Sequence, residues 1–407
     1  PPPVQKQVTP PPKQLPPPVQ KQVTPPPTTT PLQKQVTPPP TTTPLQKQVT
    51  PPPTTTPGQK QVTPQQKLVP KQPPIQVQKF GAPKGPAPQV VNVKELKGKR
   101  KEERVGKTVV IVEPGNRRIF REGNRVYIRH DEGARMRRWG NARFETRGQE
   151  RYTIVNRGGY DVVTITDSRG HMLRRYRRFP DGREYGLIDN RRRLGVGAAV
   201  VGGAVLLGLV APRILIPRDR YIVDIDQAPP ALLYETLEAP PLVPIERAYT
   251  LDEVRDNYEL RARVRSVDIN TINFSTGSWE VTPDQIPRLQ GLAEAMLKVI
   301  GENPATVFMI EGHTDAVGTP EDNASLSDRR AEAVAEILTS NFNVPPENLV
   351  SQGYGEQHLR VQTDGPNRQN RRVEVRNVTG LMAAEGGQPG DAPPDGPPPG
   401  QPGQPPG

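Results

Sequence analysis

Proline triplets recur through the first 64 residues, and they exclude a packed domain there. The sequence QKQVTP occurs five times in this stretch, and three copies continue as PPTTT. Proline fixes φ, lacks an amide donor and disfavours helix at the preceding residue. We therefore expect an extended arm without a core, and we assign residues 1–107 to a disordered Pro-rich arm and a basic linker. Residues 380–407, rich in Gly and Pro, are predicted to be a disordered tail.

Charge is unevenly distributed along the chain. The formal net charge is +12, but residues 94–193 hold 28 Lys and Arg against 14 Asp and Glu, whereas residues 266–378 hold 9 against 16. A basic segment followed by an acidic domain is not typical of a nucleic-acid-binding protein, so no nucleic-acid partner is expected. The chain has no Cys, and its four His do not fall at metal-ligand spacing. No catalytic set of residues is evident, so we predict no enzymatic activity, no metal and no cofactor.

Residues 108–190 show the pattern of antiparallel β-strands. Runs rich in β-branched and aromatic residues are separated by turn sequences such as PGN, GN and PDG. The two-residue period places Val126 and Ile128 on one face and Arg125 and Arg129 on the other. Further arginines that we expect on this face are Arg174, Arg175, Arg177 and Arg178. The sequence predicts an Arg-rich antiparallel β module, whose basic face is either solvated or binds a polyanion through residues 94–193.

The segment from 191 to 265 contains an uncharged stretch and a linker. Residues 194–212 carry no charge over 19 positions, which is long enough for one membrane span. Many Gly and Ala make the stretch only weakly hydrophobic, so a buried or envelope-associated segment remains the alternative. The remainder is predicted to be a linker with a short helix near 250–260. Thr250 and Glu253 have the spacing of a capping box at the start of that helix.

Residues 266–379 alternate strand and helix patterns. Strands are predicted at 269–274, 306–311, 348–354 and 372–378, and helices at 283–300 and about 323–339. Thr282 and Pro283 suit the start of the first helix, which carries an apolar stripe. The order βαβαββ predicts an α/β sandwich with helices on one face of the sheet.

Four motifs in this segment resemble the OmpA-like peptidoglycan-binding domain of the OmpA family. They are GHTD at 312–315, NxxLSxxRA at 323–331, QGYGE at 352–356 and NRRVEV at 370–375. The resemblance implies non-covalent binding of the diaminopimelate of the peptidoglycan stem peptide through Asp315 and Arg330. It implies further ligand contacts from Asn323, Thr314 and Ser327, with support from Phe274, Arg371 and Arg372.

The chemistry of these residues agrees with such a ligand. An amino-acid centre presents a carboxylate and an ammonium group close together; Arg330 offers a planar fork to the first and Asp315 an acceptor to the second. Asn323, Ser327 and Arg330 are spaced by four and three positions, so they share one helix face. The alternative is that Asp315 and Arg330 simply pair with each other. One departure from the family pattern is Ser275–Gly277, where many members carry an Asp or Asn pair.

The predicted function is therefore a tether in a Gram-negative-type envelope. Peptidoglycan is the expected partner of the C-terminal domain, and the outer membrane or another envelope component is the expected partner of the remainder. The expected location is the outer membrane or periplasm. Two alternatives stay open: a single-span protein of a stator-like complex anchored to peptidoglycan, and a polyanion-binding module.

Overall fold

The computed structural model describes residues 72–73, 75, 78–84, 92–191, 199–201, 204–270 and 272–382. Most of the predicted arm and the tail from residue 383 onward lie outside the described residues. Part of the stretch expected to be a basic linker is ordered. It forms the short helix α1 (Val93–Lys97) and the first strand, β1 (Lys101–Val105).

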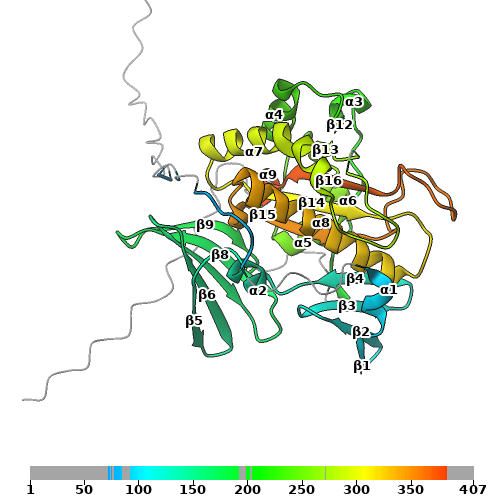
Figure 1. Ribbon diagram of the computed structural model, residues 1–407, viewed down its shortest axis with the longest axis horizontal. Helices are drawn as coiled ribbons and strands as arrows, with labels where there is room; N and C mark the ends of the chain where they lie inside the picture. The colour runs from blue at the N-terminus through cyan, green and yellow to red at the C-terminus, as the bar shows by residue number, and fades with distance from the viewer. Residues whose placement is uncertain are drawn as a thin grey trace, which may run out of the picture. The chain divides into compact units, whose positions relative to one another are not determined.

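Residues 101–189 form two antiparallel sheets, where the sequence predicted a single module (Figure 1). The first consists of β1, β2 (Thr108–Glu113), β3 (Arg117–Glu122) and β4 (Arg125–Arg129). The second consists of β5 (Ala142–Arg147), β6 (Glu150–Asn156), β7 (Asp161–Thr166), β8 (Met172–Arg178) and β9 (Glu184–Asp189). Strands follow one another in chain order, and helix α2 (Glu132–Arg137) connects the two sheets along the chain. The antiparallel β structure predicted for this region is confirmed.

The C-terminal sheet has five strands in the order β12-β13-β16-β14-β15. They are β12 (Ile222–Asp224), β13 (Ser266–Asp268), β14 (Phe308–His313), β15 (Leu349–Gly353) and β16 (Arg372–Asn377). Strand β16 is antiparallel to β13 and β14, whereas β12–β13 and β14–β15 are parallel pairs. The first predicted strand, 269–274, is displaced: pairing ends when the Ile269 amide donates to the Val373 carbonyl, and the chain then leaves the sheet.

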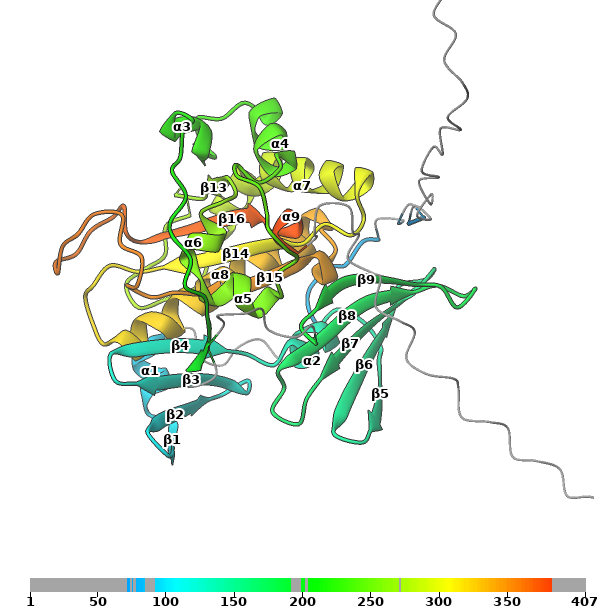
Figure 2. The same ribbon diagram turned by 180° about the vertical axis from the view of Figure 1, so that it is seen from behind.

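Helices cover both faces of this sheet, although the sequence predicted one (Figures 1 and 2). One face carries α4 (Pro230–Glu238), η1 (Pro283–Leu289), α7 (Gln290–Glu302) and α8 (Pro320–Phe342). The other carries α5 (Leu251–Asp256), α6 (Tyr258–Arg261) and α9 (Thr379–Met382). Strand β14 explains the difference, because Phe308 and Ile310 pack on the first side and Met309 on the second. A continuous apolar strand is typical of a sheet buried on both faces.

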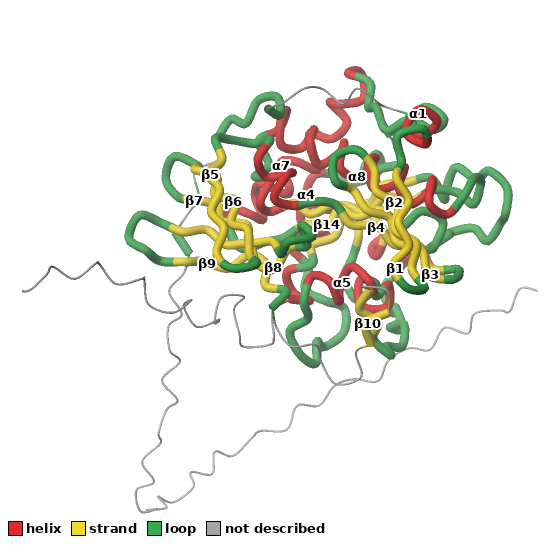
Figure 3. Tube along the Cα trace, turned by 90° about the horizontal axis from the view of Figure 1, so that it is seen from below, coloured by secondary structure: helices red, strands yellow, loops and turns green. Residues whose placement is uncertain are grey.

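Shorter elements complete the described chain. They are α3 (Arg218–Tyr221), η2 (Pro346–Asn348) and the hairpin strands β10 (Ala199–Val201) and β11 (Ala204–Leu206). Strand β10 is labelled in Figure 3. The predicted capping box of α5 is confirmed: the Glu253 amide donates to Thr250 Oγ1 (3.1 Å) and the Thr250 amide to Glu253 Oε2 (2.8 Å). Where the structure describes the chain, no helix has the length and apolar character needed to cross a membrane.

The expected arginine-rich surface is largely an internal interface. Arg175 and Arg177 are fully buried, and Arg174 is 4% exposed. Arg177 Nη2 lies 3.1 Å from Glu347 Oε1 and donates to Asn348 Oδ1 (2.6 Å), both on the C-terminal domain. The expectation of a basic face open to solvent or a polyanion is therefore wrong for these residues. Their charges are neutralised within the chain, where each buried cation requires a partner.

The same pattern joins the first sheet to α8. Arg117 of β3 donates from Nε to Asp328 Oδ2 (2.7 Å) and also pairs with Glu332. His130 lies between two carboxylates, with Nε2 3.1 Å from Glu132 Oε1 and Nδ1 3.3 Å from Asp328 Oδ2. Burial alone lowers the pKa of His130, but the charges of Asp328 and Glu132 outweigh it and raise the pKa to about 9. The basic module thus docks on the acidic domain through buried ion pairs.

Replacing Glu347 with Gln should strongly destabilise the protein, because Arg177 would keep a buried charge without its carboxylate. Removal of one partner from such a pair typically costs about 3–5 kcal/mol. Urea unfolding followed by circular dichroism measures the loss. Asp181→Asn, in an exposed pair with Arg183, is the matched control and should leave the midpoint unchanged. An unchanged midpoint for Glu347→Gln would contradict the interface.

Stability should also fall as the pH rises through about 9. The raised pKa of His130 means that its stabilising contribution is complete below the unfolded-state pKa of about 6.5 and is lost as the folded-state group deprotonates. Urea midpoints of the wild type should therefore decline between pH 6.5 and 9. His130→Gln should be less stable at pH 6.5 and should show a smaller decline over this range. An equal decline in both proteins would show that His130 is not responsible.

Candidate ligand-binding pocket

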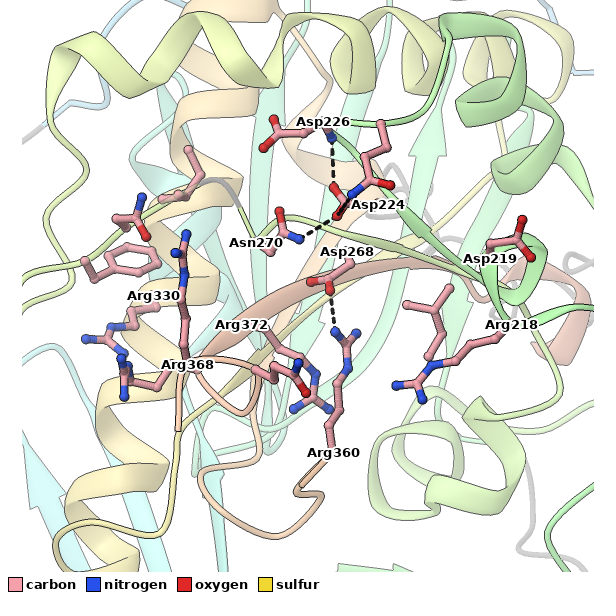
Figure 4. A pocket seen from close by; sticks show the side chains of 17 residues that line it. Arg218, Asp219, Asp224, Asp226, Asp268, Asn270, Arg330, Arg360, Arg368 and Arg372 are labelled. Carbon is pink, nitrogen blue, oxygen red and sulfur yellow. Dashed lines mark hydrogen bonds and ion pairs between the residues drawn. The ribbon is translucent and has the colours of Figure 1, made fainter. Parts of the chain in front are cut away.

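A cavity of about 1050 Å³ opens beside the C-terminal sheet (Figure 4). Its walls come from four places: the segment around α3 and β12, the chain following β13, helix α8, and the loop before β16. Six arginines and four aspartates are among its lining residues, so the cavity presents both signs of charge. Such a lining suits a polar ligand that carries both a carboxylate and an ammonium group.

Arg330 reaches this cavity from α8 and is only 5% exposed (Figure 4). Its Nε donates to the Ser278 carbonyl (2.9 Å) and its Nη2 to the Ser275 carbonyl (3.3 Å). The guanidinium carbon lies 4.8 Å from the centroid of the Phe274 ring, within cation–π range. Burial, followed by the charge of Arg371, lowers the pKa of Arg330 to about 10, so the group is still a cation at neutral pH.

Asp315 pairs with Arg371 and not with Arg330. Its Oδ2 accepts from Arg371 Nη1 (2.6 Å) and from the Asn367 amide (3.2 Å). Its Oδ1 accepts a longer bond from the Val317 amide (3.4 Å). Among the described residues, no carboxylate forms an ion pair with Arg330. The structure therefore does not show the alternative in which Asp315 and Arg330 form an ion pair with each other. The charge of Asp315 still raises the pKa of Arg330, but by less than burial and Arg371 lower it.

The other three predicted ligand residues connect the loops behind Asp315. Asn323 Nδ2 donates to Glu356 Oε2 (2.6 Å) and to the Asp315 carbonyl (3.3 Å). Ser327 Oγ donates to the Ala324 carbonyl (3.0 Å) and accepts from the Gly355 amide (2.9 Å). These two side chains and Thr314 are buried and do not line the cavity. Their contacts fix the GHTD and QGYGE loops against the start of α8.

Two glycines allow helix α8 to lie close to the strands β14 and β15. A Cβ atom on Gly312 would lie 1.9 Å from the Ser327 carbonyl oxygen, and one on Gly353 would lie 2.3 Å from the Asp328 nitrogen. Helix α8 therefore packs directly against the backbones of β14 and β15. The glycines of the two motifs have a steric role that spacing alone did not show.

The three residues predicted to support the site have different positions: some border the pocket, and one is bound within the sheet. Phe274 and Arg371 line the cavity, and the side chain of Arg371 is 43% exposed. Arg372 also lines it, but its Nε donates to Glu374 Oε1 (2.6 Å) and its Nη2 to the His358 carbonyl (3.1 Å). Arg371 therefore borders the cavity with a partly exposed side chain, whereas Arg372 is engaged in the sheet.

Sequence reasoning missed the wall formed by β12 and its neighbours. Asp224, Asp268, Glu374 and Glu311 stand in register on four adjacent strands, forming an acidic row across the sheet. Arginines neutralise the inner members; Arg360, for example, pairs with Asp268 and with Glu374 Oε1 (3.0 Å). The sequence does contain a sign of this row, because each of the four strands contains apolar residues and has one acidic residue inside it or at its end. In the described ranges, no group of three His, Asp or Glu could hold a metal ion.

Comparison with known proteins assigns the C-terminal part to a family. Residues 273–372 match the OmpA family, and this part of the chain is an OmpA family domain. Over 85 residues the chain is 34% identical to outer membrane porin F of Pseudomonas aeruginosa, covering 21% of this chain and 23% of that protein. Over 92 residues it is 33% identical to the peptidoglycan-associated lipoprotein of Haemophilus influenzae, covering 23% and 57%.

A solved structure is also similar. The peptidoglycan-associated lipoprotein of Burkholderia pseudomallei is 27% identical, with a TM-score of 0.22, and the similarity covers 26% of this chain and 86% of that one. The similarity to the two curated relatives spans less than two thirds of their lengths. The family match covers residues 273–372, so the basic sheets lie outside it.

The substitution Ser327→Ala tests whether Ser327 supports the fold or contacts the ligand. The substitution leaves the buried Gly355 amide without its acceptor, which typically costs about 1–3 kcal/mol. We expect a lower urea midpoint and no loss in the amount of protein that co-sediments with purified peptidoglycan. Thr314→Val is the matched comparison, since Thr314 Oγ1 has no hydrogen-bond partner among the described residues, and it should retain stability. Weaker ligand binding by Ser327→Ala at unchanged stability would instead make Ser327 a ligand residue.

Proposed function

We propose that the C-terminal domain, residues 266–379, binds peptidoglycan non-covalently through the diaminopimelate of the stem peptide. The family match and the resemblance of the four motifs support this ligand class. The activity is binding and not catalysis. With its remaining parts, the protein would tether the outer membrane or another envelope component to the cell wall, on the periplasmic side.

The burial and the hydrogen bonds of Arg330 give the main support for this ligand. It is a buried cation at the cavity, held by two carbonyl oxygens and without a carboxylate partner in the described chain. Carbonyl oxygens orient a guanidinium without cancelling its charge. A ligand carboxylate would complete the missing ion pair, and a charge-assisted bond of this kind is stronger than a neutral one. Phe274 beneath the guanidinium limits its movement.

Asp315 has a second role in this proposal. Through its Oδ2 it holds Arg371, whose partly exposed side chain lines the cavity beside Arg330. Asp315 is buried and is not among the residues that line the cavity, but its Oδ1 accepts only a long bond and keeps acceptor capacity for the ammonium group of a ligand. The same carboxylate thus positions one cation and offers a contact to another.

Replacing Arg330 with Ala should abolish co-sedimentation of the full chain with purified peptidoglycan, because the cation for the ligand carboxylate is lost. Arg330→Lys should bind measurably but weakly, since lysine keeps the charge without the planar fork. Arg183→Ala, which removes an exposed arginine far from the cavity in sequence, controls for net charge and should bind as the wild type does. Folding of the Arg330→Ala variant is checked by circular dichroism. If the folded variant co-sediments with peptidoglycan as the wild type does, the proposal is overturned.

A further inference from the structure

The turn from Ser275 to Ser278 positions the guanidinium of Arg330. The Ser278 amide donates to the Ser275 carbonyl (3.0 Å) and closes the turn. The carbonyls of the same two residues accept from Arg330 at 2.9 and 3.3 Å. This turn contains Ser275–Gly277, where many members of the OmpA family carry an Asp or Asn pair. In this chain the backbone atoms of the turn contact Arg330. The position of Arg330 therefore depends on what holds this turn.

Helix α1 holds the turn from outside. The Val93 amide donates to the Gly277 carbonyl (2.9 Å), and Asn92 forms an isolated antiparallel β-bridge with Ser278. Asn92 also caps α1, because its Oδ1 accepts from the Lys94 amide (2.8 Å). Gly277 has φ +70°, a left-handed conformation that glycine tolerates, and this permits the sharp turn against Asn92.

Apolar packing and ion pairs fix α1 in place. Val93 and Leu96 are buried against Trp279, with Leu326 of α8 packed at the edge of the cluster. Lys97 Nζ lies 2.7 Å from Asp322 Oδ2, and Arg100 Nη1 lies 2.7 Å from Asp322 Oδ1. The clamp, defined as Asn92 to Lys97, thus contacts both the turn that holds Arg330 and the helix that carries it.

We propose that this clamp is a positioning element for the ligand site and that its docking is energetically coupled to ligand binding. It lies outside residues 273–372, so the family domain by itself does not contain it. When the clamp is docked, the turn holds Arg330 in one orientation. When the clamp is released, the turn loses its hydrogen bond from the Val93 amide, and Trp279 loses the side chains that cover it. Coupling of this kind is reciprocal, so the bound ligand must also stabilise the docked clamp. The inference rests on the proposed function, because it assigns control of the same site.

Removing the clamp contacts should weaken ligand binding while Arg330 remains. Asn92→Ala removes the cap and Leu96→Ala removes a side chain that is 1% exposed. We expect affinity for meso-diaminopimelate, measured by calorimetry on the full chain, to fall about fivefold or more, as for linked sites. Leu187→Ala, equally buried in the second β-sheet, is the matched control and should retain affinity. In an Arg330→Lys background the clamp substitutions should have a much smaller effect, because the fork they position is absent.

Hydrogen exchange tests the reciprocal effect without a clamp substitution. In the wild type, meso-diaminopimelate should slow exchange of amides 93–97, including the Val93 amide that donates to Gly277. Arg330→Ala should show no such change. Wild-type affinity in both clamp variants, or ligand-independent exchange of 93–97 in a protein that binds, would overturn the clamp and leave the proposed function standing. Full binding by Arg330→Ala would instead overturn the proposed function.

Discussion

Buried ion pairs between the arginines of the basic module and the carboxylates of the acidic domain are the constraint on which the structure depends. Arg177 with Glu347, and Arg117 with Asp328, join the second and first β-sheets to the C-terminal domain. Charges removed from water must be matched, because an unpaired buried charge costs several kcal/mol. The two opposite net charges of the sequence are thus largely directed at each other, which leaves fewer cations for an external polyanion.

The carboxylates of the C-terminal sheet follow the same rule of charge matching, whereas Arg330 at the cavity does not. Arginines neutralise the inner carboxylates of the acidic row, including Glu374 and Glu311. Arg330 is the contrasting case, since carbonyl oxygens hold it and no described carboxylate pairs with it. The interior of the sheet is therefore neutralised, whereas the cavity beside it is lined by several arginines that include Arg330. Helix α1, which precedes the first sheet in the chain, also contacts the turn that holds Arg330.

Local patterns predicted the elements of the C-terminal domain better than their packing. The helices were placed within a few residues at 283–300 and 323–339, because proline, threonine caps and apolar periodicity are local signals. The first strand was misplaced, since its end depends on pairing with β16. Arg330 and Asp315 were expected to act as neighbours, but Asp315 is paired with Arg371, a residue 56 positions away. Nothing in the local spacing indicates such a choice of partner.

The sequence by itself determined the two long helices of the C-terminal domain and most of its strands, where charge of each sign accumulates, and which four motifs mark the OmpA family domain. These properties follow from backbone preferences and short-range periodicity. Only the tertiary structure decided that Arg175 and Arg177 are internal, that both faces of the C-terminal sheet are covered, and that α1 supports the turn beneath Arg330. The physical reason is that burial and ion pairing join residues far apart in the chain, and a charge pattern does not specify whether its partner is solvent, a ligand or another part of the same chain.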